Sequence, residues 1–321
     1  MRCWGYSLFA YLIFLCSCER NEIFEQSRDN NLCEECEYLF VLGDIQEYTA
    51  NKQKMDYYNK TISWIGSQCQ YFDACAIIQT GDITANNHRD QWSHFYSSTH
   101  SIADNIPFIS CVGNHDYDWN NNLIIESRES TLFSQYTAFS ATLMSLVEVY
   151  QHEKMENSVY KLHINNKEFR ILTLEYGTRP AVVNWALSHV KNNPHINYII
   201  LTHEFLSANG ERLKYYCSAQ EQFKEDYLFP DQVWETFISE CANIKAVICG
   251  HNGFNKVLYS DNKYGKSIPQ VLFNLQYQEN GGNGYVELWE FSKNSNNVYM
   301  SIYDTINREF LTEKVLLFSY N

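Results

Sequence analysis

The sequence predicts an α/β fold with a largely parallel central sheet and a second, antiparallel sheet. Between residues 38 and 249, short apolar runs alternate with segments whose apolar residues recur at helical spacing, which is typical of βα units. After Gly253 the pattern changes to strand-like runs separated by turns, which predicts the antiparallel sheet. The 321 residues, 45% of them hydrophobic, can bury a substantial core, so the composition excludes a mainly disordered chain.

Residues 1–18 have the features of an export signal. Arg2 precedes a mostly apolar stretch, residues 8–15, that is too short to cross a bilayer. The tetrad Leu-Cys-Ser-Cys that ends at Cys18 resembles a bacterial lipobox, so we expect an exported lipoprotein anchored to a membrane through Cys18. The alternative is a plain cleaved signal peptide, which gives a secreted or periplasmic protein.

The remainder of the chain is expected to form a tether and one folded domain. Residues 19–37 are charged and rich in asparagine and have no apolar period, which predicts the tether. The folded domain is expected at 38–321. Within it, residues 117–157 interrupt the alternation of strands and helices and contain many serines, threonines and aromatics, so we expect an inserted lid or wall near the functional site.

The individual elements follow from the same patterns. Five apolar runs predict strands buried on both faces, at 38–42, 74–78, 108–112, 198–201 and 246–249. Apolar residues at helical spacing predict helices at 55–69, 92–102, 183–190 and 233–241. Two runs joined by Asn165-Asn166 predict a β-hairpin, 158–164 with 168–175. The second sheet is expected to contain strands at 256–260, 269–277, 285–291 and 298–303.

A side chain able to bind a metal follows each of the five apolar runs. These side chains are Asp44, Asp82, Asn114, His203 and His251. In an open α/β sheet, ligands bind at the carboxyl ends of the strands, so we expect the five to converge on one edge. One Gly-Asp pair is usually a turn and one histidine is usually structural, but all five in this order indicate a metal centre. Carboxylate, amide oxygen and imidazole without thiolate suit Mn, Fe(II) or Zn.

The motifs, in chain order, are Gly-Asp, Gly-Asp, Gly-Asn-His-Asp, His and Gly-His. This order resembles that of the calcineurin-like metallophosphoesterase superfamily, from about residue 38 to the C-terminus. The resemblance implies a sandwich of two mixed β-sheets flanked by helices. It also implies a dinuclear centre of divalent metal ions, at which a metal-bound hydroxide attacks a phosphate ester.

The resemblance also implies a role for each side chain. Asp82 is expected to bridge two metals, and Asp44 is expected to bind the first of them. The shell of the second metal is expected to be completed by Asn114, His203 and His251. His115 is expected to assist the leaving group, and Asp116 is expected to orient the ring of His115.

Two departures from the superfamily pattern concern the first metal. Gln46 and Gly253 stand where the superfamily has histidines. Gln46 can offer a neutral amide oxygen and Gly253 offers no side chain, so we expect one tight site and one weak first site that prefers Mn or Mg. The chain also resembles a subgroup of the superfamily that combines Gly-Asp-x-Gln with a late Gly-Gly-Asn-Gly, here residues 281–284. We expect these glycines either to line the mouth of the pocket or to form a tight hairpin between strands.

Composition and motifs together bound the function. The formal charge of −14 and the pI near 5.1 argue against binding to a nucleic-acid backbone. We expect the substrate to be a phosphate ester, with phosphomonoesterase and phosphodiesterase activity both open. The alternative is a non-catalytic binding or scaffold protein on the same fold. The complete ligand set of the second metal and the presence of His115 favour the enzyme.

Overall fold

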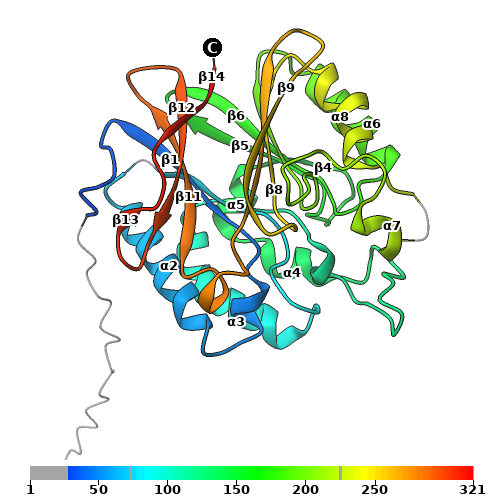
Figure 1. Cartoon of the computed structure of the whole chain (residues 1–321), viewed down its shortest axis with the longest axis horizontal. Helices are drawn as coiled ribbons and strands as arrows, with labels where there is room; N and C mark the ends of the chain where they lie inside the picture. Colours follow the sequence, from blue (N-terminus) through cyan, green and yellow to red (C-terminus); the bar gives the residue numbers. More distant parts are fainter. Residues whose placement is uncertain (1–27, 73, 224–225, 321) are drawn as a thin grey trace, which may run out of the picture.

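Two mixed β-sheets of seven strands each form the centre of the structure, a computed structural model that describes residues 28–72, 74–223 and 226–320 (Figure 1). Sheet one contains, in spatial order, β13 (Glu309–Phe310), β12 (Asn297–Asp304), β11 (Tyr285–Ser292), β1 (Cys36–Leu42), β2 (Ala74–Gln79) and β3 (Phe108–Ser110), with β14 (Val315–Ser319) paired to β12. Sheet two contains β4 (Leu146–Val149), β5 (Ser158–Ile164), β6 (Lys167–Thr173), β7 (Asn197–Leu201), β8 (Ile244–Cys249), β10 (Ser267–Asn274) and β9 (Phe254–Asp261). The two mixed sheets that the family resemblance implies are therefore confirmed.

The helices pack on these sheets. They are α1 (Gln46–Thr49), α2 (Met55–Gln68), α3 (Arg89–Ala103), α4 (Phe133–Thr137), α5 (Ser140–Ser145), α6 (Pro180–Lys191), α7 (Ser218–Gln222) and α8 (Pro230–Thr236), with single 3₁₀ turns at η1 (Asn114–Asp116), η2 (Ile238–Glu240) and η3 (Glu279–Gly281). α2 packs on sheet one, where the ring of Trp64 contacts Phe40 of β1 and Tyr303 of β12. α6 and α8 lie on the opposite side of the molecule, against sheet two (Figure 1).

The side chains of β7 show how one strand serves two cores. Ile199 and Leu201 belong to the core that sheet two shares with sheet one. Tyr198 and Ile200 belong to the separate core beneath α6 and α8. Because successive side chains of a strand point to opposite faces, a continuous apolar run is what a strand between two layers requires.

The expectation of a separate antiparallel sheet after Gly253 is wrong. β10 pairs in parallel with β8, and β9 pairs antiparallel with β10 at the edge of sheet two. β11 pairs antiparallel with β1 and extends sheet one. The five apolar runs are divided in the same way, because β1, β2 and β3 lie in sheet one while β7 and β8 lie in sheet two. The C-terminal strands thus satisfy backbone groups that two short parallel sheets would leave unpaired at their edges.

Part of the predicted tether packs on the domain. Asp29 is buried, and its carboxylate accepts hydrogen bonds from the indole of Trp64 and the hydroxyl of Tyr303. Leu32 is also buried, and β1 begins at Cys36. The fold therefore includes residues before 38. Residues 1–27, with the predicted signal and its Cys18, lie outside the described residues.

The predicted insert, residues 117–157, is partly built into the core. β4 forms one edge of sheet two, and the rings of Phe133 in α4 and Phe139, directly before α5, are buried.

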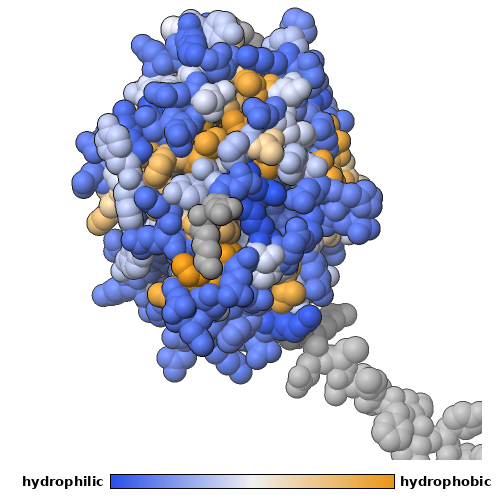
Figure 2. All heavy atoms as spheres, turned by 90° about the vertical axis from the view of Figure 1, so that its right-hand side faces the viewer, coloured by the Kyte–Doolittle hydropathy of each residue, from blue (hydrophilic) through white to orange (hydrophobic). Residues whose placement is uncertain are grey.

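Figure 2 shows that the α7 side of the molecule is largely hydrophilic, with apolar patches between the polar ones. Among the described residues, no helix is both long enough and apolar enough to cross a bilayer.

Candidate metal centre

The five predicted metal ligands lie in loops that directly follow strands of both sheets. Asp44 and Asp82 follow β1 and β2, and Asn114 lies in the 3₁₀ turn η1 after β3. His203 and His251 follow β7 and β8 of the other sheet. The edge on which they converge is therefore formed by two sheets, whereas we expected a single sheet. Asp82 and His251 have positive φ values of 53° and 67°, which reverse the chain directly at the site.

Two glycines allow the loops to approach closely. A Cβ atom at Gly113 would lie 2.2 Å from the backbone nitrogen and from Oδ1 of Asp82. A Cβ atom at Gly250 would lie 2.3 Å from Oδ1 of Asp44. Any other residue at either position would displace a carboxylate of the centre, which explains the Gly before Asn114 and the Gly before His251.

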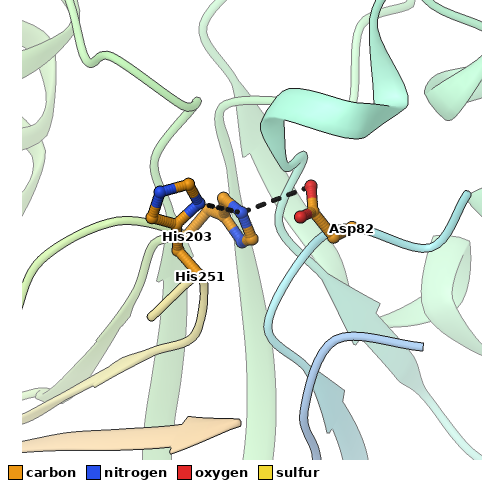
Figure 3. Close-up of side chains that lie close together, drawn as sticks. All are labelled: Asp82, His203 and His251. Atoms are coloured by element: carbon orange, nitrogen blue, oxygen red, sulfur yellow. Dashed lines mark hydrogen bonds and ion pairs between the residues drawn. The ribbon is translucent and has the colours of Figure 1, made fainter. Parts of the chain in front are cut away.

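Four side-chain atoms that can each give a lone pair to a metal ion lie close together: Asp82 Oδ1, Asn114 Oδ1, His203 Nε2 and His251 Nδ1. We call these four ligand atoms the four-donor set. Asn114 Oδ1 lies 3.1 Å from His203 Nε2 and 3.0 Å from His251 Nδ1. The two imidazole nitrogens are 3.1 Å apart, and His203 Nε2 is 3.3 Å from Asp82 Oδ1 (Figure 3). Ligands bound at about 2.1 Å to one ion lie about 3.0 to 3.4 Å apart, so this set fits one divalent metal.

Hydrogen bonds outside the four-donor set fix the orientation of both rings. His203 Nδ1 donates to the backbone oxygen of Thr80 at 2.7 Å, so its Nε2 carries the free lone pair. His251 Nε2 lies 2.9 Å from Ser218 Oγ and 3.6 Å from Glu204 Oε1, which leaves Nδ1 for the metal. Glu204 also accepts the backbone N–H of Ser218 at 2.7 Å and so fixes the start of α7. Such outer partners set the tautomer and basicity of metal-binding histidines.

The electrostatic field at the four-donor set favours a positive charge. Burial of His203 opposes protonation, but the carboxylates of Asp82 and Asp44 outweigh burial and raise the pKa of His203 to about 10. Burial also opposes ionisation of Asp82, but the charge of His203 outweighs it and lowers the pKa of Asp82. The same field that favours a proton on His203 favours a metal cation in its place.

Asp44 lies beside this set but is hydrogen-bonded differently. Its Oδ2 accepts from Asn274 Nδ2 at 2.5 Å and from Gln276 Nε2 at 3.3 Å. Its Oδ1 accepts from Thr80 Oγ1 at 3.2 Å, and the backbone N–H of His251 lies 3.2 Å from both oxygens. Burial raises the pKa of Asp44 well above its usual value. We call Asp44, Asn274 and Gln276 the Asp44 group.

Gln46 does not complete a second metal site in this arrangement. Its Nε2 donates to Asp82 Oδ2 at 3.1 Å, and its buried Oε1 has no hydrogen-bond partner among the described residues. In the orientation observed, amide N–H groups of Asn274 and Gln276 face Asp44 and that of Gln46 faces Asp82, so these three groups do not offer their oxygens to a cation between the two carboxylates.

His115 lies at the rim of the centre and is half-buried. Its backbone N–H donates to Asp82 Oδ1 at 2.9 Å, and its Nδ1 donates to the backbone oxygen of Ala85 at 2.8 Å. The ring of Trp119 packs against the imidazole with centroids 4.7 Å apart. These contacts leave Nε2 of His115 as the atom available for proton transfer.

Asp116 does not orient the ring of His115, so that expectation is wrong. Its carboxylate accepts the backbone N–H of Thr84 at 2.9 Å and that of Gly113 at 3.0 Å. Burial, and after it the charge of Asp82, raises the pKa of Asp116 to about 6. Asp116 therefore ties together the loops after β2 and β3, and the Ala85 carbonyl and Trp119 orient the imidazole.

Sequence reasoning missed four residues that contact the centre: Ser218, Trp119, Asn274 and Gln276. Asn274 ends an apolar strand, which is the same signal that identified Asp44 and His203, but it was assigned to the interior of a predicted strand. Gly281, Gly282 and Gly284 of the 281–284 loop line one cavity together with Asp44 and Gln276. The Gly284 N–H donates to the hydroxyl of Tyr48 in α1 at 3.1 Å.

Comparisons with known proteins agree with this geometry. The sequence profile of the calcineurin-like phosphoesterases matches residues 38–254. The uncharacterized protein YvnB of Bacillus subtilis is 21% identical in an alignment of 286 positions that covers 83% of this chain. The chain spans only about a fifth of the length of that relative, since the match covers 20% of it. Among solved structures, a dimetal phosphatase from Danio rerio is similar, with a TM-score of 0.56 and 10% identity, covering 88% of this chain and 99% of the other.

Proposed function

Because the chain belongs to the calcineurin-like phosphoesterase family, we propose that it hydrolyses a phosphate ester at a metal ion held by Asp82, Asn114, His203 and His251. The observation that carries the proposal is the convergence of four possible ligand atoms, each 3.0 to 3.3 Å from at least one other. When bound, a divalent metal polarises the phosphoryl oxygen and lowers the pKa of a bound water. The nitrogen and oxygen ligands suit Mn, Fe(II) or Zn.

The residues of the chain supply orientation and proton transfer. Thr80 and Ser218 hold the two imidazoles so that Nε2 of His203 and Nδ1 of His251 face the position where the metal would bind. His115, with Nδ1 fixed by Ala85, presents Nε2 to the leaving-group oxygen and donates a proton when its ring is protonated. Trp119 excludes water from one face of that ring. His115 is therefore the proposed general acid.

A chelator experiment tests the proposed function. The purified chain should hydrolyse an aryl phosphate ester, lose activity on dialysis against EDTA, and regain it with Mn²⁺ or Zn²⁺. His115→Ala should retain the metal and lose hydrolysis, with the smallest loss for esters whose leaving group needs no proton. A chain that binds metal but hydrolyses neither monoesters nor diesters would support the scaffold alternative instead.

We propose further that the protein is exported and held at a membrane by a lipid on Cys18. The support is the signal-like sequence of residues 1–18 alone. Cys18→Ala should move the protein from the membrane fraction to soluble or unprocessed material, measured by fractionation and by the mass of the mature N-terminus. Unchanged fractionation without a lipid mass would indicate a plain signal peptide.

A further inference from the structure

The side chain of Asn274 can only donate hydrogen bonds toward Asp44. Its Oδ1 accepts the backbone N–H of Gln276 at 3.0 Å, so Nδ2 must face the other way. Nδ2 donates both to Asp44 Oδ2 and to the backbone oxygen of His251, at 3.1 Å from the latter. Because a carbonyl oxygen only accepts, these contacts exclude the flipped amide. Asn274 therefore cannot offer its oxygen to a cation beside Asp44.

The lone pairs of Asp44 are already used by neutral donors. An ionised carboxylate has about four lone-pair sites. Two amides, one hydroxyl and one backbone N–H occupy those of Asp44. Asp82, in contrast, directs Oδ1 into the four-donor set and receives Gln46 only on Oδ2. The amide N–H groups of Asn274 and Gln276 therefore face Asp44, and that of Gln46 faces Asp82. Each amide directs the positive end of its dipole at a carboxylate, as a second cation would direct its charge.

Tyr277 fills the space in which a ligand at position 253 would lie. A Cβ atom at Gly253 would be 2.5 Å from Cδ2 and 2.7 Å from Cε2 of Tyr277. The phenol ring therefore packs directly on the glycine backbone, two residues after His251. A residue with a Cβ atom at 253 therefore requires the ring of Tyr277, which is 76% exposed, to move aside, and the glycine present offers no side-chain ligand.

On these grounds we propose that the chain forms a one-metal centre that favours phosphodiesters over phosphomonoesters. In this centre the carboxamides of Gln46, Asn274 and Gln276 take the place of a second cation. The proposal rests on the proposed function and names its substrate class. The carboxylates of Asp44 and Asp82 carry at most two negative charges, which one divalent cation balances, whereas two such cations would leave excess positive charge. Among the described residues, the hydrogen bonds and ion pairs of these carboxylates involve no lysine or arginine.

The ester preference follows from this charge balance. A phosphomonoester is mostly dianionic at neutral pH, while a diester carries one negative charge. Glu204, 3.6 Å from His251, adds a further carboxylate next to the centre. A dianion therefore meets more repulsion here than a monoanion.

Metal counting tests the first part of the proposal without reference to activity. The purified chain is loaded with excess Mn²⁺, dialysed, and measured by plasma emission and electron paramagnetic resonance. The wild type should bind one ion per chain with the hyperfine pattern of isolated Mn(II). Asp44→Asn should also bind one ion, and His203→Ala should bind none. Two ions per wild-type chain would overturn the proposal, and this count holds even if Asp44→Asn folds poorly. Loss of one of these two ions in Asp44→Asn would place the second ion at Asp44. No bound ion in the wild type would overturn the proposed function together with the inference.

Ester preference tests the second part. The wild type should hydrolyse bis(p-nitrophenyl) phosphate with a kcat/KM at least about tenfold above that for p-nitrophenyl phosphate, on the basis of one extra charge at short range. Asp44→Asn, which removes an ionisable carboxylate from the centre, should shift this ratio toward the monoester, and the exposed control Asp90→Asn should leave it unchanged. A wild-type preference for the monoester, or a ratio that Asp44→Asn does not change, would overturn the proposed preference.

Discussion

The four-donor set and the Asp44 group lie side by side at the same edge, and each contains an aspartate and an asparagine, yet their hydrogen bonds run in opposite senses. In the four-donor set, two carboxylate or amide oxygens and two imidazole nitrogens lie 3.0 to 3.3 Å from a neighbour in the set, and a positive charge, from a metal ion or from a proton on His203, stabilises them. In the Asp44 group, amide N–H groups face the carboxylate. A polar side chain at a strand end is therefore not sufficient evidence for a ligand. What decides is whether its neighbours are donors or acceptors.

The largest effect is expected in the four-donor set. His203→Ala removes a ligand and also releases the Thr80 carbonyl from its hydrogen bond, so metal binding and hydrolysis should both fall by more than about 100-fold, since losing even an outer partner costs about 10- to 100-fold. Metal content and kcat/KM measured on the same sample check this. His163→Ala, at an exposed position of β5, is the matched control. Full metal binding by His203→Ala would show that the set is not a metal site.

Glu287 offers a second carboxylate held by neutral donors, away from the metal centre. It is fully buried in β11, and its oxygens accept from Asn255 Nδ2 at 2.9 Å and Trp289 Nε1 at 2.7 Å. Burial raises its pKa from 4.5 to about 8 in spite of these two hydrogen bonds. Neutral donors alone thus do not offset the burial of this carboxylate.

The sign of the resulting pH dependence follows from proton binding. Below pH 4.5, Glu287 is protonated in both the folded and the unfolded chain. Between pH 4.5 and about 8, Glu287 is protonated only in the folded chain. The free energy of unfolding therefore falls as pH rises through this window. At about 1.4 kcal/mol per pKa unit, the loss amounts to a few kcal/mol. Glu287→Gln should remove this part of the slope, as measured by urea unfolding at several pH values. Parallel slopes for the variant and the wild type would contradict the prediction.

The smallest effect is expected one shell outside the four-donor set. Ser218→Ala removes the hydroxyl that lies 2.9 Å from His251 Nε2, so metal affinity should fall by about tenfold without loss of the fold. Competition with a fluorescent chelator measures the affinity. Ser97→Ala, on the exposed face of α3, should leave it unchanged. If Ser218→Ala binds metal as tightly as the wild type, the ring of His251 is oriented by Glu204 or by packing instead.

The sequence was sufficient to predict the features that depend on local pattern. Apolar runs located β1, β2, β7 and β8, because a strand buried on both faces needs apolar residues at every position. The predicted hairpin at Asn165-Asn166 is present, with positive φ at both residues, since asparagine tolerates the turn that joins β5 and β6. Asp82, Asn114, His203 and His251, which the structure brings together, are predicted from their places after strands, which chain order alone reveals.

Tertiary structure decided what depends on distant partners. Backbone pairing places β10 beside β8 and β11 beside β1, and an apolar run carries no information about which of two sheets it will join. The partner of Asp44 is Asn274, 230 residues away, and the sense of that hydrogen bond depends on a second contact with Gln276. Residue type determines which atoms can bind a cation, but only the approach of the other chain segments determines whether a cation or an amide stabilises them.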